Sequence, residues 1–231
     1  MAQDSLQFKG FATHSAKVND PSFDVEGEYI GSCSDDGYIN NLFTDEREKF
    51  EYHHPMKVVS LDPDYARKSL RRFAARGLAG QLLLNTKGWF GNRNQVLHSG
   101  EGPIHVVKWR TSLLAWANDA GVKVYDAANH HRITYIEHPR ASPPAELLRP
   151  HLVWQDDRVL VIGWGTSLKI AAIQHKSSGG TDTKDRNYSS STSAKQVDIV
   201  AAFQTDYFIS VLAPYGDALL ILASIPDKKD G

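Results

Sequence analysis

Short apolar runs alternate with polar breaks along most of this chain. Residues 104–126, IHVVKWRTSLLAWANDAGVKVYD, hold two apolar runs, a polar break that ends at Gly121, and a third alternating run. Apolar residues at every second position fill one face of a pleated strand, and a glycine in the break permits a tight turn. The pattern predicts three antiparallel strands of one small sheet.

The same arrangement recurs along the sequence. Glycine-marked breaks end at Gly37, Gly80, Gly121 and Gly165, at spacings of 43, 41 and 44 residues. This spacing lies within the ~40–45 residue period of WD-type propeller blades, each a four-stranded antiparallel sheet. In each unit we expect an apolar strand before the break and another strand further upstream, and a more polar outer strand at 48–54, 94–100 and 131–138.

The last unit is shorter. We expect a fifth unit to begin at residue 198, continue through 206–214 and end with 217–226. The prediction is therefore an all-β WD-repeat β-propeller of about four and a half to five blades, formed as one partial domain over residues 1–231. A Ser-, Thr- and Gly-rich segment, 176–195, is expected to be a disordered loop between the fourth and fifth units.

Composition limits the possible partners. The chain has 231 residues and a formal net charge of −1, so it lacks the positive field that tight non-specific binding to nucleic acid needs. Its one cysteine, Cys33, excludes an internal disulfide framework and fits a reducing compartment. Apolar runs fall short of the ~18 residues of a membrane-spanning helix. We expect a cytoplasmic protein with at most peripheral membrane association.

Candidate catalytic and metal sites are weak. The pairs His53-His54 and His130-His131 place neighbouring side chains on opposite faces of a strand, which does not make a metal site. Residues 163–167, GWGTS, lack the order of a nucleophile elbow and the ending of a phosphate loop. Asp35-Asp36-Gly37 fits a hairpin turn better than a calcium loop.

The remaining chemistry-bearing residues fit the core. Cys33 lies in an apolar strand without a neighbouring base, which favours a buried small hydrophobe. Four tryptophans fall on strand candidates, where core packing explains them: Trp109, Trp116, Trp154 and Trp164. We find no His, Asp or Glu that recurs at one position in successive units, as a metal site in the propeller channel would require. We expect no catalytic residue, no cofactor and no metal.

One basic cluster stands out in the segment 65–77, YARKSLRRFAARG: Arg67, Lys68, Arg71 and Arg72, with Arg76 following. One interpretation is a solvated loop between two strands. The other is a docking patch for an acidic partner segment or a phospholipid headgroup, because arginine binds carboxylate and phosphate through two parallel hydrogen bonds.

Several phrases of the sequence resemble a known family. KWR (108–110), LAWAN (114–118), GVKVYD (121–126) and GWGTS (163–167) occur in the order and spacing of the N-terminal propeller of the vacuolar protein sorting-associated protein 41 family, in particular its fungal members. The resemblance covers about residues 22–226. Family members also have an additional blade before a phrase like HSAKVND (14–20), and helical repeats and a RING-type zinc domain further on. This difference suggests a fragment or a truncated product.

The resemblance implies a function in membrane traffic. It implies a subunit of the homotypic fusion and vacuole protein sorting (HOPS) tethering complex, peripheral on the vacuole or late endosome. The implied partners are other tethering subunits, a late-endosomal or vacuolar Rab GTPase, and the adaptor protein complex of the Golgi-to-vacuole route. The family's membrane-sensing amphipathic helix is not transferred, because the Ser-rich segment lacks bulky apolar residues.

Three functional hypotheses follow. The leading one is a non-enzymatic protein-interaction scaffold. The second is an enzyme in the propeller channel, such as a metal-assisted hydrolase or lyase. The third is a non-functional truncated fragment with unpaired sheet edges.

Overall fold

The chain forms a series of small antiparallel sheets. A computed structural model describes residues 14–43, 46–65, 71–140, 142–175 and 195–225. Within these residues it contains four four-stranded sheets and a two-stranded one, and no helix that could span a bilayer. The strands are β1 (Val18–Phe23), β2 (Tyr29–Ser34), β3 (Tyr38–Phe43) and β4 (Glu46–Glu51); β5 (Val59–Leu61), β6 (Phe73–Arg76), β7 (Leu82–Gly88) and β8 (Gly91–His98); β9 (Val106–Arg110), β10 (Leu113–Asn118), β11 (Gly121–Asp126) and β12 (His131–Glu137); β13 (His151–Trp154), β14 (Val159–Trp164), β15 (Ser167–His175) and β16 (Lys195–Gln204); and β17 (Phe208–Tyr215) with β18 (Ala218–Ser224).

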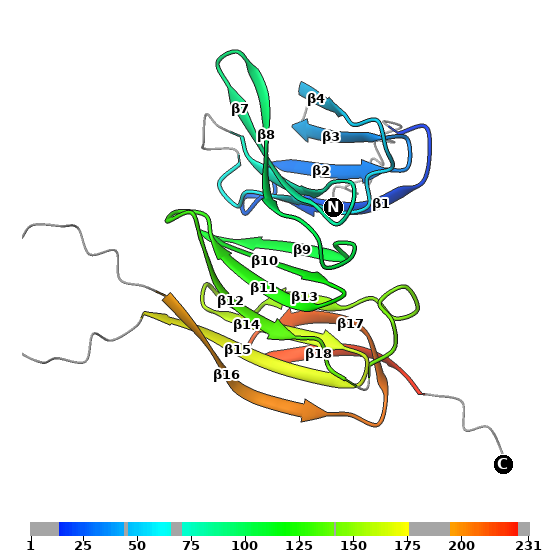
Figure 1. The fold of residues 1–231 in the computed structure, drawn as a ribbon, viewed down its shortest axis with the longest axis vertical. Helices are drawn as coiled ribbons and strands as arrows, with labels where there is room; N and C mark the ends of the chain where they lie inside the picture. The colour runs from blue at the N-terminus through cyan, green and yellow to red at the C-terminus, as the bar shows by residue number, and fades with distance from the viewer. Residues whose placement is uncertain (1–13, 44–45, 66–70, 141, 176–194, 226–231) are drawn as a thin grey trace, which may run out of the picture.

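The sheets are arranged side by side as propeller blades (Figure 1). The first strands of successive blades contact one another in chain order: β1 with β5, β5 with β9, β9 with β13, and β13 with β17. Within the described residues the last hairpin, β17–β18, has no extended contact with the first blade. The predicted all-β propeller of about four and a half to five blades is confirmed, and the described residues form four complete blades and one half blade.

The prediction for the fifth unit is wrong in one respect. Residues 198–203 belong to β16, which pairs antiparallel with β15 as the outer strand of the fourth blade; Ile170 lies opposite Ala201 and Leu168 opposite Phe203. The fifth unit therefore begins at β17, and the Ser-rich segment connects two strands of one blade. Apart from Lys195, which begins β16, that segment lies outside the described residues. The disorder expected of it therefore stays a prediction.

The core lies between the blades. One apolar cluster joins the second and third blades through Ala74, Leu84, Leu114 and Trp116, among others. Similar clusters join the first blade to the second, the third to the fourth, and the fourth to β17–β18. Because a lone four-stranded sheet leaves its apolar faces in water, this packing of neighbours supplies most of the apolar burial that stabilises the fold.

The far face of β17–β18 has no blade against it in the described residues. Leu219 and Ile221 pack toward the fourth blade, whereas Val211 and Leu222, which lie opposite each other in the hairpin, are 46% and 64% exposed. Both faces of this hairpin are thus apolar, and one of them is uncovered.

The glycine breaks of the repeat are the turns between the second and third strands. Gly121 shows why glycine is needed there: its φ is 153°, and a Cβ at this position would lie 2.2 Å from the Ile136 carbonyl oxygen. Any side chain would force apart the turn and the neighbouring strand β12.

Candidate protein-interaction site

The predicted basic cluster is only partly described. Arg67 and Lys68 lie outside the described residues, so their part of the prediction stays a prediction. Arg71 forms an ion pair with Glu48 at 3.3 Å and lies over the Tyr29 ring. Arg72 donates to the buried carboxylate of Asp62, from Nη2 at 2.7 Å and from Nε at 2.8 Å.

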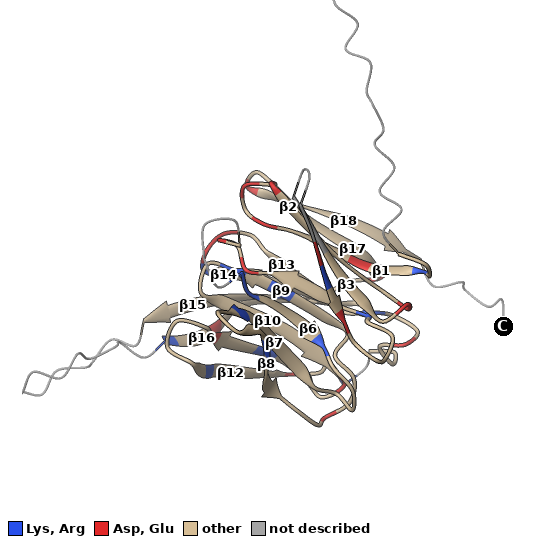
Figure 2. Cartoon of the chain, turned by 90° about the horizontal axis from the view of Figure 1, so that it is seen from above, with Lys and Arg blue, Asp and Glu red and all other residues tan. Residues whose placement is uncertain are grey.

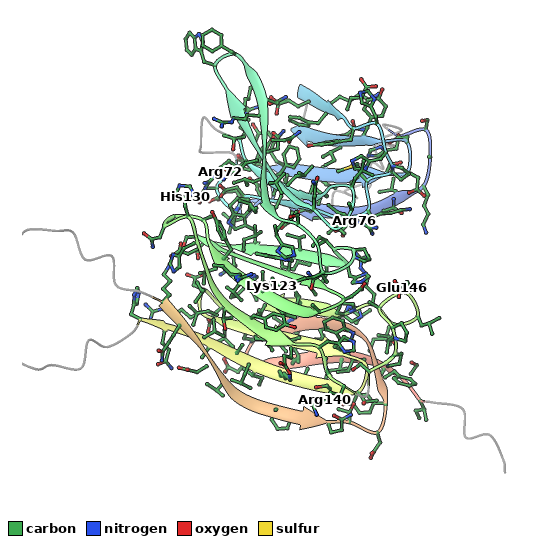
Figure 3. The ribbon with its side chains drawn as sticks, in the orientation of Figure 1. Arg72, Arg76, Lys123, His130, Arg140 and Glu146 are labelled. Carbon is green, nitrogen blue, oxygen red and sulfur yellow. The ribbon has the colours of Figure 1, made fainter. Side chains whose placement is uncertain are left out.

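Arg72 and Arg76 lie on different sides of the molecule. Figure 3 shows Arg72 near the edge that carries His130, and Arg76 toward the opposite edge. Arg76 ends β6 and is partly buried, and burial together with the charge of Arg149 lowers its pKa. The structure therefore separates Arg76 from Arg71 and Arg72, although the three are near neighbours in sequence.

Arg72 lines a cleft to which turns of all four complete blades contribute, and which we call the rim cleft. It has a volume of about 630 Å³. It is formed by the turns after β1, β5, β9, β11 and β13. Its charged lining consists of Asp64, Arg72, Arg110 and Asp157, and His130 lies beside them. The rest of the lining is small or apolar, including Val25, Pro63 and Ala127.

The rim cleft carries both signs of charge. Arg110 Nε donates to Asp157 Oδ1 at 2.7 Å across the mouth, and Arg72 is neutralised by Asp62. Figure 2 shows the same mixture elsewhere, with acidic and basic residues spread over many loops. Such a surface suits another folded protein with mixed charges better than a polyanion, which requires a field of one sign.

A buried ion pair supports the neighbouring turn. Asp126, at the end of β11, is fully buried and its Oδ2 accepts from Lys195 Nζ at 2.8 Å. Burial alone would raise the pKa of Asp126, but donors from Lys195, Asn129 and the Ala128 amide outweigh it and lower that pKa to about 2. These contacts hold the β11–β12 turn, which carries His130, next to β16.

A histidine recurs in successive blades, which the glycine-marked breaks did not predict. His14, His54, His98 and His138 precede the first strands of the four blades at intervals of 40, 44 and 40 residues. The expectation that no histidine recurs in successive units was therefore wrong. The interval itself is the signal that could have revealed the repeat.

Each of these histidines contacts different partners, and they do not gather around a common centre. His14 Nδ1 donates to the Asp36 carboxylate at 3.0 Å, and His14 Nε2 lies 2.8 Å from the Ser32 hydroxyl oxygen. His98 lies 3.2 Å from the Asn118 amide nitrogen, and burial followed by the Lys123 charge lowers its pKa. His138 stands edge-on to the Trp164 ring. His98 and His138 thus link one blade to the next, whereas His14 makes its contacts within the first blade.

A second missed group is His105, Asp119 and Glu146, whose ligand atoms all lie within 4.8 Å of one another. His105 Nε2 and Asp119 Oδ1 are 2.6 Å apart, and Arg149 Nε donates to the His105 carbonyl oxygen at 2.6 Å. The bond from Arg149 is to the backbone of His105, so it supports the position of His105 just before β9.

The other candidates have structural roles. Cys33 is fully buried, and burial followed by the Asp20 charge raises its pKa to about 12. The Asp36 carboxylate accepts from the Tyr38 amide in the predicted hairpin turn, and Gly165 lies in the turn between β14 and β15. Trp109, Trp116 and Trp164 are buried as predicted, and Trp154 is partly buried.

The adjacent antiparallel sheets define a β-propeller, and the rim cleft lies where turns of its blades meet. Comparison with a solved structure agrees on the fold: the chain matches the Cps50 (Swd1) β-propeller domain of Myceliophteria thermophila with a TM-score of 0.66 at 12% identity, over 91% of this chain and 68% of that one. A family model named Beta-prop_Vps41, with the description "Vps42 beta-propeller", matches residues 1–231. The chain belongs to this Vps41 β-propeller family.

Similar curated proteins carry the same name. The chain is 66% identical over 227 residues to the vacuolar protein sorting-associated protein 41 homolog of Solanum lycopersicum, and 63% identical over 228 residues to that of Arabidopsis thaliana; each match covers 97% of this chain. The expected likeness to fungal members in particular is wrong, because the protein of Schizosaccharomyces pombe is 32% identical over 94% of this chain. The chain spans about a quarter of the length of these relatives, 24%, 23% and 24% respectively.

Proposed function

We propose that this chain is a non-enzymatic protein-interaction scaffold in vacuolar protein sorting. It acts as part of the HOPS tethering complex, peripherally on the vacuole or late endosome. Its partners are other tethering subunits, a late-endosomal or vacuolar Rab GTPase and the adaptor protein complex of the Golgi-to-vacuole route. The observation that carries this proposal is the match of the whole chain to a family whose members are named for vacuolar protein sorting.

The rim cleft supports the scaffold part of the proposal. Its walls are turns held by rigid strands, by the Arg72–Asp62 pair and by the Lys195–Asp126 pair. A preformed cleft with arginine at its mouth loses little conformational entropy on binding, and arginine is enriched among residues that dominate binding energy. We place the partner contact at this cleft.

Binding between purified proteins tests the proposal. The 231-residue chain is immobilised and titrated with purified tethering subunits, and separately with the Rab GTPase loaded with GTP or GDP. We expect saturable binding to at least one of them. The combined variant Arg110→Ala and His130→Gly should weaken that binding about tenfold or more. Glycine suits position 130, where φ is 54°.

The matched control is Arg140→Ala, which removes an exposed arginine away from the rim cleft (Figure 3). It should leave binding unchanged. Failure of every tethering subunit and of both Rab nucleotide states to bind the chain would refute the proposed function. Equal loss in the control and the cleft variant would refute the placement at the rim cleft.

A further inference from the structure

The β7–β8 hairpin ends in two fully exposed aromatic residues. The strands pair from Leu82 opposite His98 out to Gly88 opposite Gly91, which leaves Trp89 and Phe90 as the two residues of the turn. Trp89 is 93% exposed and Phe90 is 101% exposed. Figure 1 shows this hairpin projecting beyond the rest of the second blade.

Nothing in the fold requires aromatic residues there. Turns of this kind are usually built from glycine, asparagine or aspartate, which relieve backbone strain or bond locally. Here Gly91, with φ 117°, takes up the positive φ, and a Cβ at Gly91 would meet no atom within 4 Å. The backbone of the turn therefore does not depend on the two aromatic side chains, and these side chains do not fill the core. Their exposure to water is unfavourable.

The base of the hairpin fixes where the tip points. Asn85, on β7, donates to the Asn94 side-chain oxygen at 2.9 Å, and the hydroxyl of the partly buried Tyr52, from the first blade, donates to the same oxygen at 3.2 Å. Leu82, Leu83 and Leu84 anchor β7 in the core. The tip is a projection on a rigid support.

The hairpin's own charged residues are of one sign. Residues 86–98, TKGWFGNRNQVLH, contain no Asp or Glu, and Lys87 and Arg93 lie within three residues of the aromatic pair. Lys87 forms an ion pair with Glu48 on β4 of the first blade, whereas Arg93 has no ion pair among the described residues. Arg93 is exposed on β8, where it faces Thr86 across the hairpin.

We propose that the β7–β8 tip inserts Trp89 and Phe90 into the interfacial region of an anionic lipid bilayer, with Arg93 at the level of the headgroups. Indole and phenyl rings next to cationic side chains favour this region, because the rings leave water while the charges face phosphate. A protein partner fits less well, since binding hot spots are surrounded by further contact area and this convex tip has only polar neighbours such as Asn92.

The inference does not depend on the protein partners of the proposed function. The tip and the rim cleft contain different residues, so vesicle binding and protein binding respond to different substitutions. A chain that binds vesicles but no tethering protein would refute only the proposed function, and the converse would refute only this inference.

Vesicle flotation tests the inference on the 231-residue chain. Vesicles of mixed phosphatidylcholine and phosphatidylserine are compared with vesicles of phosphatidylcholine alone. We expect the chain to float with the anionic vesicles, and the double variant Trp89→Ser and Phe90→Ser to bind about ten- to a hundredfold more weakly. Arg93→Glu should weaken binding to the anionic vesicles and leave the neutral ones unaffected. The control Phe23→Ser, at an exposed residue of the first blade, should bind like the parent chain.

Tryptophan fluorescence gives a second readout. Of the five tryptophans, Trp89 is the one on the tip, and Trp109, Trp116 and Trp164 are buried. Brominated lipids should quench Trp89, and Trp89→Phe should keep vesicle binding while losing this quenching. The inference is overturned if the parent chain binds no vesicle, if the double variant binds as well as the parent, or if iodide in water still reaches Trp89 on vesicles. It is also overturned if the double variant loses a tethering subunit while its vesicle binding is unchanged.

Discussion

Leu114→Ala tests whether the packing between blades stabilises the fold. Leu114 is fully buried on β10, in the cluster that joins the third blade to Ala74 and Leu84 of the second. Truncation to alanine removes three carbons, worth about 0.8 kcal/mol each in transfer free energy, and leaves a cavity between two stiff sheets. We expect the free energy of unfolding to fall by about 3–4 kcal/mol.

Urea denaturation measures this change. The m-value in urea should be unchanged. In thermal denaturation, the same loss corresponds to a drop in Tm of roughly 6–16 °C for a chain of this size. The matched control is Leu222→Ala, which truncates the same side chain where it is 64% exposed and should cost less than about 0.5 kcal/mol. A loss below about 1 kcal/mol for Leu114→Ala, or an equal loss for both variants, would contradict the argument that blade packing carries the stability.

Three further predictions concern single positions. Gly121→Ala should destabilise the chain by about 1–3 kcal/mol, because its Cβ meets the Ile136 carbonyl; a neutral effect in thermal denaturation would disprove the steric argument. Cys33 should resist thiol reagents until the chain unfolds, because it is buried and its pKa is raised to about 12; rapid labelling of the native chain would contradict this. The lowered pKa of Asp126 means that its contribution to stability is complete above its ordinary pKa of about 3.9 and is lost as pH falls toward 2. The Asp126→Asn variant should therefore have a lower free energy of unfolding than the parent chain at neutral pH, and should lose less of it as the pH falls from about 3.9 to 2. If the free energy of unfolding of the variant and of the parent chain fell in parallel with pH, the pair of Asp126 with Lys195 would contribute nothing.

Local patterns in the sequence predict the blades well. The breaks at Gly37, Gly80, Gly121 and Gly165 are all turns between the second and third strands, because tight turns and alternating strands are encoded by neighbouring residues. β16 was assigned to the wrong unit because its pairing is not encoded by neighbouring residues. Its partner β15 ends at His175, twenty residues before β16 begins, and periodicity gives no information on pairing across such a gap.

The candidate site was much harder to predict. The rim cleft combines turns that are distant in sequence, from Asp64 to Asp157, and their meeting depends on how the blades stack. The recurring histidines were missed because their neighbours differ: His14 pairs with an aspartate, His98 contacts an asparagine and His138 an indole ring. The arginine cluster could be read from sequence, but the engagement of Arg72 by the buried Asp62 could not.

Hydrogen exchange most directly tests the claim that partner proteins dock at the rim cleft. Exchange is measured on the chain alone and in the presence of saturating purified tethering subunit or GTP-loaded Rab GTPase. The account predicts slower exchange in the turns at residues 110–113 and 127–131, with little change at residues 118–121 on the opposite edge of the third blade. Protection confined to the opposite edge, or none at either, would contradict it.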